Sequence, residues 1–146
     1  IKIYPNASFI FISRHPLNFF QSSINGIEKL SKIILPLQKV DLNDLDEMTF
    51  NNCKKIVNRM NEEIDLIPKK NFCSVKYEDL VSSPVDTLSK IHDEIRLGIF
   101  NKSQNDLNNY LHSIKEYKTN KYRPYTVELK DRILKEFESY IKKWEY

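Results

Sequence analysis

Arg14 and Ser22 supply a cation and a hydroxyl, side-chain types that suit the binding of an anion. Four large β-forming residues, Phe9 to Ile12, come before Arg14, and Pro16 follows it closely. Proline cannot continue a strand ladder, but its fixed φ suits the first turn of a helix. The segment therefore predicts a strand that ends in a guanidinium and turns into a helix, where a phosphate or sulfate is the natural ligand.

The elements that position Arg14 are predicted from apolar spacing. Phe9 to Ile12 is too short for a buried helix, so we expect a fully buried strand. Apolar residues then recur every three or four positions and predict an amphipathic helix. They are Leu17, Phe20, Ile24 and Ile27. Open α/β sheets bind ligands at the carboxyl ends of their strands, which is where this arrangement places Arg14.

The same segment resembles the second nucleotide-binding motif of the sulfotransferases, which take a sulfuryl group from 3'-phosphoadenosine 5'-phosphosulfate (PAPS). It reads Pro5-Asn6-Ala7-Ser8-Phe9-Ile10-Phe11-Ile12-Ser13-Arg14-His15-Pro16. In that family an Arg-Asp-Pro sequence follows the strand, and the arginine and a serine eight residues later hold the 3'-phosphate. The resemblance implies this role for Arg14 and Ser22. His15 replaces the aspartate. We expect it to hydrogen-bond to the groups that bind the phosphate rather than to act as the base.

A second segment resembles the later strand of that family and its Tyr-Glu-Asp-Leu sequence. It reads Phe72-Cys73-Ser74-Val75-Lys76-Tyr77-Glu78-Asp79-Leu80, with Pro84 and an amphipathic helix after it. The resemblance implies that Tyr77 lies near the adenine, whereas the residues alone allow it simply to pack on the core. Glu78 and Asp79 are sequence neighbours that rarely converge on one substrate, so we expect them to stabilise a helix start.

The predicted fold class is α/β, a partial P-loop-type sulfotransferase fold with few parallel strands, about 9–13 and 72–77, packed by several helices. Met48 to Ile67 is the longest expected internal helix, and Asp41 to Asp46 is expected to be irregular. The predicted inner face of the Met48–Ile67 helix holds Cys53, Ile56, Met60, Ile64 and Ile67.

Three further helices are predicted after the second strand. Ser83 is a possible cap and Pro84 a first residue for a helix that buries Val85, Leu88, Ile91 and Ile95 and ends at Gly98. A shorter helix carries Leu107, Tyr110, Leu111 and Ile114, and the final helix runs from Val127 to Trp144. The inner face of that last helix is predicted to hold Leu129, Ile133, Phe137, Ile141 and Trp144.

The 146 residues, 40% of them hydrophobic, are interpreted as a single domain, 1–146, that is the C-terminal part of a sulfotransferase domain. Gly26 and Gly98 are its two glycines, so the chain holds no glycine-rich phosphate loop. In the resembled family such a loop, after the first strand, holds the 5'-phosphosulfate. We therefore expect the loop and the catalytic base to lie upstream, and no catalytic residue is assigned.

Composition excludes other kinds of site. The net charge of +3 does not indicate a nucleic-acid partner. Cys53 and Cys73 lie in apolar patterns and are interpreted as buried free thiols. The spacing of His15, His92 and His112 does not indicate a metal site, so no metal is expected. No apolar stretch is long enough for a membrane span. The compartment stays open between cytoplasm and Golgi lumen.

The densest basic and aromatic tract runs from Lys115 to Tyr125, where Pro124 prevents a continuous helix. By resemblance it corresponds to a late loop that folds over the nucleotide. That correspondence implies Lys118, Asn120, Lys121 and Arg123 as contacts to the 3'-phosphate. A solvated basic face explains the same tract equally well.

The resemblance implies sulfuryl transfer from PAPS to a hydroxyl or amine, with this chain supplying the 3'-phosphate-binding half and inactive by itself. The acceptor stays open among carbohydrate, lipid, protein and small molecule. The alternative is a non-enzymatic interaction domain whose basic, tyrosine-rich tract binds a partner or a polyanion. A third interpretation, a phosphoryl-transfer enzyme, would require a preference for ATP over a 3'-phosphorylated nucleotide.

Overall fold

The structure is a computed structural model, and it describes residues 3–34, 41–98, 100, 104–118, 120 and 122–146. The chain packs as two compact units, which are described separately. The first unit comprises Ile1–Arg14 and Asp65–Asn120, and the second comprises His15–Ile64 and Lys121–Tyr146. That residues 1–146 form a single domain stays a prediction.

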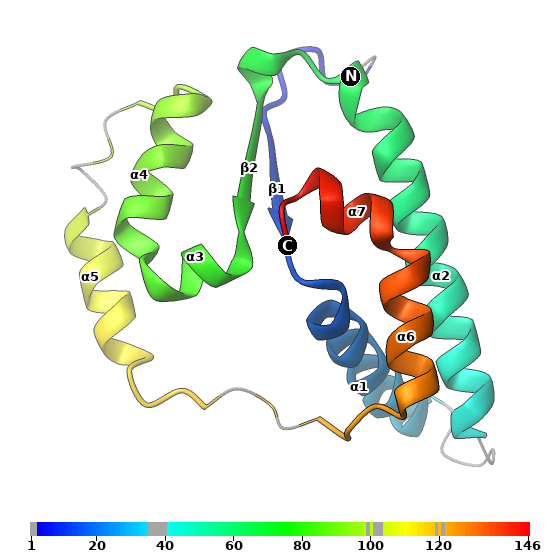
Figure 1. Cartoon of the computed structure of the whole chain (residues 1–146). Coiled ribbons are helices and arrows are strands. Elements are labelled where there is room, and N and C mark those ends of the chain that lie inside the picture. The colour runs from blue at the N-terminus through cyan, green and yellow to red at the C-terminus, as the bar shows by residue number, and fades with distance from the viewer. Residues whose placement is uncertain (1–2, 35–40, 99, 101–103, 119, 121) are drawn as a thin grey trace. The chain divides into compact units, whose positions relative to one another are not determined.

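The first unit is built on a two-stranded parallel sheet, drawn as neighbouring arrows in Figure 1. Strand β1 (Phe9–Ser13) pairs with β2 (Phe72–Lys76) in a register that places Phe9 beside Phe72 and Ser13 beside Lys76. The Ser13 hydroxyl donates a hydrogen bond to the Val75 carbonyl across the pair, over 3.3 Å. The predicted parallel strands are confirmed, although β2 ends one residue early.

Two helices cover part of this sheet. Helices α3 (Tyr77–Ser82) and α4 (Pro84–Glu94) both pack against β2. Short 3-10 turns, Ile64–Leu66 and Lys69–Asn71, precede that strand, and helix α5 (Gln104–Ser113) follows α4. The core comprises Cys73, Val75, Ile91 and Ile95, with Leu88 packed against it. The predicted inner face is confirmed at Leu88 and Ile91 of α4 and at Ile95, which follows the end of the helix.

Both ends of α4 differ in detail from the prediction. Ser83 occupies the N-cap, but its side chain makes no capping hydrogen bond. The helix ends at Glu94, not at Gly98, because Arg96 takes a left-handed φ of 54° and reverses the chain first. The Leu97 N–H then donates to the His92 carbonyl over 3.0 Å, which satisfies a carbonyl of the last turn.

The prediction that β1 is fully buried was wrong. Ile10 and Ile12 are 45% and 49% exposed. The register places these residues beside Cys73 and Val75, so all four share one face of the sheet. Helix α4 packs against β2 on that face, and β1 keeps its apolar side chains half open.

The second unit is a helical assembly around aromatic side chains. Helix α1 (Pro16–Ile34) packs against α2 (Leu42–Glu63) and α6 (Val127–Glu136), and α7 (Glu138–Lys143) follows α6 (Figure 1). Five core side chains are at most 3% exposed. They are Phe20, Phe50, Ile133, Phe137 and Tyr140. Edge-on ring contacts join Phe20 to Phe50 and Phe50 to Phe137 at 5.8 and 5.9 Å.

Helix α2 begins six residues before the predicted start at Met48, and so includes most of the acidic segment expected to be irregular. The buried positions recur every four residues from Leu45 through Thr49 and Cys53 to Val57. This spacing turns Ile56 outward, where it is 68% exposed, so its predicted place in the core was wrong. Leu45 supplies an apolar anchor for the extra turn, and Asp44 favours the positive helix start.

The predicted final helix is two helices. Phe137 separates α6 from α7 with φ −104° and ψ 17°, outside helical values. It is nevertheless 1% exposed, and both Phe137 and Tyr140 make ring contacts with Phe19, at 5.6 and 5.9 Å. The break therefore allows two successive aromatic residues of this segment to pack on α1.

Candidate functional site

Arg14 ends the first of the two chain segments that form the first unit, and it follows β1 directly. Tyr77 follows β2, and the carboxyl ends of paired parallel strands lie at the same edge of a sheet. The guanidinium carbon of Arg14 lies 4.3 Å from the Tyr77 ring centroid. The structure thus brings together two predicted site residues that are far apart in the sequence. Their role in binding a nucleotide stays a prediction.

Tyr77 opens α3 instead of ending β2. Glu78 and Asp79 occupy the first turn of this helix with exposed side chains, so their expected place at a helix start is confirmed. The Asp79 carbonyl accepts hydrogen bonds from the Thr87 hydroxyl, at 3.1 Å, and the Ser83 N–H, at 2.8 Å. These bonds tie the start of α4 to α3 and support the segment that presents Tyr77.

His15 and Ser22 belong to the second unit. The His15 Nδ1 accepts a hydrogen bond from the Leu17 N–H over 3.2 Å, so the imidazole caps the start of α1. Its ring also meets the Tyr146 ring edge-on, with 5.7 Å between centroids. Ser22 is partly buried on α1. A joint 3'-phosphate clamp of Arg14 and Ser22 stays a prediction.

The predicted phosphate contacts of the basic tract do not all lie in the same unit. Lys118 and Asn120 are exposed in the first unit, and Lys121 lies outside the described residues. Arg123, in the second unit, forms an ion pair with Asp46 and approaches Glu28 at 3.6 Å. Carboxylates therefore engage the Arg123 guanidinium, which argues against it as a phosphate ligand.

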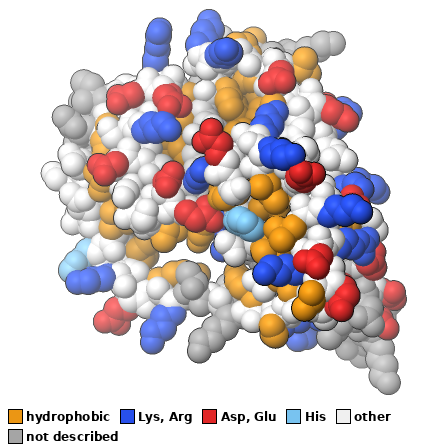
Figure 2. Space-filling view, viewed as in Figure 1, with side chains coloured by type: hydrophobic (Ala, Val, Ile, Leu, Met, Phe, Trp, Pro, Cys, Tyr) orange, Lys and Arg blue, Asp and Glu red, His pale blue; other side chains and the backbone are white. Residues whose placement is uncertain are grey.

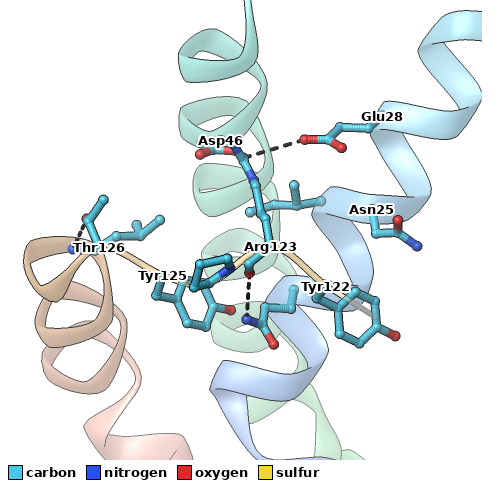
Figure 3. Close-up of a pocket in the computed structure, with 11 residues that line it drawn as sticks. Asn25, Glu28, Asp46, Tyr122, Arg123, Tyr125 and Thr126 are labelled. Atoms are coloured by element: carbon cyan, nitrogen blue, oxygen red, sulfur yellow. Dashed lines mark hydrogen bonds and ion pairs between the residues drawn. The ribbon is translucent and has the colours of Figure 1, made fainter. Parts of the chain in front are cut away.

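Arg123 also lines a pocket of about 300 Å³ within the second unit (Figure 3). We call it the Arg123 pocket. Its polar lining comes from α1, α2 and the segment before α6, and comprises Gln21, Asn25, Glu28, Asp46, Tyr122, Arg123, Tyr125 and Thr126. Ile24, Pro124 and Leu129 add apolar surface. The sequence motifs do not indicate this pocket, because its charged residues are far apart in the sequence.

Hydrogen bonds hold the segment that carries Arg123. The Gln21 side-chain amide donates to the Arg123 carbonyl over 3.1 Å, and the Tyr125 hydroxyl donates to the Leu17 carbonyl over 2.6 Å. Thr126 caps α6 by accepting from the Leu129 N–H at 3.2 Å. The pocket is therefore fixed against α1 in the folded unit.

Burial dominates the electrostatics of Asp46. It raises the pKa of this carboxyl above its usual range, although the Arg123 charge and hydrogen bond oppose the shift. Glu28 adds a second carboxylate, so the lining holds two acidic groups and one guanidinium. The pocket therefore carries an excess of negative charge when all three are ionised.

The remaining features are the two cysteines, possible metal ligands and possible membrane spans. Cys53 and Cys73 are free and buried, as predicted. Within the described ranges, no group of three His, Cys, Asp or Glu side chains is placed to hold a metal ion. No helix in the described part of the chain is long and apolar enough to cross a membrane.

Comparisons with known proteins agree with the motifs. Residues 1–101 match the family model described as the sulfotransferase family. Omega-hydroxy-beta-dihydromenaquinone-9 sulfotransferase Stf3 from Mycobacterium bovis, and the protein of the same name from Mycobacterium tuberculosis, are each 28% identical over 123 residues. Each match covers 84% of this chain and 31% of the relative, so the chain spans about a third of the length of these curated relatives. No solved structure matches significantly.

Proposed function

Since the chain belongs to the sulfotransferase family, we propose that it takes part in sulfuryl transfer from PAPS to a hydroxyl or amine. In this proposal the chain supplies the part of the nucleotide site that holds the 3'-phosphate. The single observation that carries it is the stacking of Arg14 on Tyr77 at the carboxyl edge of the sheet.

The stacking suits anion binding for a geometric reason. A cation–π contact uses the face of the guanidinium, whereas its hydrogen bonds leave from the edge in a fixed fork. Tyr77 can therefore hold the plane of Arg14 while the edge binds phosphate oxygens, with Ser22 as the proposed second ligand. Lys118, Asn120 and Lys121 stay proposed contacts from the basic tract.

The remaining parts of the reaction are assigned to sequence outside residues 1–146. Two glycines at positions 26 and 98 do not make a phosphate loop, and the curated relatives are about three times as long as the match. PAPS supplies the sulfuryl group, and in-line transfer to the acceptor requires charge to be neutralised at the bridging oxygen. We propose that this chain contributes positioning of the nucleotide, and that residues outside it contact the transferred group.

An NMR titration tests the proposal. Adenosine 3',5'-bisphosphate and 5'-AMP are titrated into the 15N-labelled chain, because only the former carries the 3'-phosphate. Charge-assisted and neutral hydrogen bonds from Arg14 and Ser22 amount to roughly 3–4 kcal/mol, so we expect a Kd no tighter than about 1 mM. Saturable shifts with the bisphosphate alone, lost in Arg14→Ala, are the expected result.

Lys70→Ala is the matched control, because Lys70 is an exposed cation of the same unit at the amino end of β2. It should bind the bisphosphate as the unchanged chain does. Equal or absent responses to both nucleotides would contradict the proposal, and a preference for ATP would favour phosphoryl transfer. Salt-sensitive polyanion binding that ignores Arg14→Ala would favour the interaction domain. On the face shown in Figure 2, basic and acidic side chains are interspersed.

A further inference from the structure

We propose that the Arg123 pocket binds a sugar ring through its hydroxyl groups, as a carbohydrate-binding site distinct in chemistry from the Arg14 anion site. Its further assignment as the acceptor site rests on the function proposed above. The pocket lies wholly within the second unit and measures about 300 Å³. That volume is at the lower end of the roughly 300–1,000 Å³ typical of ligand pockets, which suits one ring.

The charge of the pocket disfavours an anion despite the arginine. Arg123 is already paired with Asp46 and lies near Glu28, at 3.6 Å. A phosphate or sulfate entering this lining would meet two carboxylates and would have to displace one from the guanidinium. A neutral ligand that donates hydrogen bonds meets no such opposition, because carboxylate oxygens accept them.

The amides of the lining offer both donors and acceptors. Asn25 is partly buried, and its side-chain amide makes no hydrogen bond within the described part of the chain. Gln21 uses its amide nitrogen on the Arg123 carbonyl, and its side-chain oxygen makes no bond to another described residue. Vicinal sugar hydroxyls both donate and accept, so they can satisfy these groups together with the Glu28 carboxylate.

An apolar wall completes the match to a sugar. Tyr122 lies on the same side of Arg123 as Asn25 in Figure 3. Ile24, Pro124 and Leu129 also line the pocket. A pyranose presents C–H groups on its ring faces and hydroxyls around its rim, so it can meet both kinds of surface at once.

A lipid tail fits the same lining poorly. An alkyl chain in the pocket would cover Asn25 and Gln21 without giving them hydrogen bonds, which costs free energy for every buried polar group left unpaired. The pocket is also preformed, since the bonds from Gln21 and Tyr125 already hold the Arg123 segment on α1. A rigid ring therefore binds without first ordering the wall.

Saturation-transfer NMR on the whole chain tests this inference. The probes are the methyl α-glycosides of D-glucose, D-mannose and D-galactose, with 1-octanol as the apolar alcohol. We expect saturable transfer to at least one glycoside, and chemical-shift changes at Asn25 and Tyr122.

Asn25→Ala should weaken the affinity at least threefold, and Tyr122→Leu is the second variant if Asn25→Ala fails to fold. Asn52→Ala, an exposed asparagine of α2, should leave the affinity unchanged.

Three results would overturn the inference: no saturable transfer to any glycoside, transfer that Asn25→Ala and Tyr122→Leu leave unchanged, or saturable transfer to 1-octanol alone. Adenosine 3',5'-bisphosphate is added to the same samples as a competitor, and we expect it not to displace the glycoside. Displacement from Asn25 and Tyr122 would also overturn the inference. Lost glycoside binding with retained, Arg14-dependent bisphosphate shifts would overturn this inference alone and leave the proposed function standing.

Discussion

The guanidinium of Arg14 stacks on the Tyr77 ring, with 4.3 Å between the guanidinium carbon and the ring centroid. Each residue follows one strand of the parallel pair, and the register that sets Ser13 beside Lys76 brings their successors to one edge. The two sulfotransferase-like motifs therefore meet through these two side chains as well as through the paired strands, and the side-chain contact can be tested by mutation.

Replacing Tyr77 separates the effect of the ring from that of its hydroxyl. A cation–π contact contributes about 0.5–2 kcal/mol, so Tyr77→Leu should weaken adenosine 3',5'-bisphosphate binding by roughly two- to thirtyfold. Tyr77→Phe keeps the ring and should change the affinity by less than about twofold. The NMR titration described above measures both. Unchanged affinity in Tyr77→Leu would show that the ring does not position Arg14.

Phe20 should dominate the stability of the second unit. It is fully buried, meets Phe50 edge-on and stacks on Tyr125 at 6.3 Å. Phe20→Ala should lower the free energy of unfolding by about 3–5 kcal/mol, because it removes a large buried side chain and leaves a cavity. Urea unfolding followed by Trp144 fluorescence measures the change.

Leu30 provides the control on the same helix, since its side chain is 52% exposed. Leu30→Ala should change the free energy of unfolding by less than about 0.5 kcal/mol. Comparable losses in the two variants would mean that the aromatic cluster is not the core of this unit.

The pair of Arg132 and Glu47 should make stability depend on pH. The Arg132 guanidinium donates hydrogen bonds to both carboxylate oxygens of Glu47, one of them over 3.1 Å. This hydrogen bonding lowers the pKa of Glu47. A depressed carboxyl pKa stabilises the fold above the unfolded pKa, and the stabilisation is lost as the pH falls through the folded pKa. Glu47→Gln should therefore cost up to about 1 kcal/mol at pH 7, and less at pH 3.

Urea midpoints of Glu47→Gln and the unchanged chain at the two pH values measure this difference. Glu62→Gln is the matched control, because Glu62 is exposed on the same helix and forms no ion pair with any described residue. A deficit of Glu47→Gln that persists at pH 3 would assign the effect to packing of the side chain rather than to its charge.

The thiols should resist modification in the folded protein. Burial, followed by the neighbouring Glu94, raises the pKa of Cys73 to about 12, and burial also raises that of Cys53. At pH 8 both are thus held as thiols, which are poor nucleophiles. Ellman's reagent should react slowly with the native chain and with native Cys53→Ala. After guanidinium unfolding, we expect two thiols to react in the unchanged chain and one in Cys53→Ala. Rapid native reaction of Cys53→Ala would show that Cys73 is accessible.

Local sequence rules predicted the elements that carry the nucleotide motif. The run Phe9–Ser13, the proline at the start of α1 and the Ser83-Pro84 start of α4 all act through short-range backbone preferences, so their positions were readable without tertiary information. Arg14 at a strand end followed from the same rules, whereas the family resemblance came from the likeness of these residues to known motifs.

Tertiary packing decided the rest. Ile56 and Val57 are both apolar. Which of the two is buried depends on the row of buried residues of α2 that begins at Leu45. Phe137 leaves the helix without a glycine or proline, because ring contacts with α1 outweigh local preference. Arg123 meets Asp46 and Glu28 only when the chain segments that carry them pack in one unit. Such contacts join residues tens of positions apart, and no local rule of spacing encodes them.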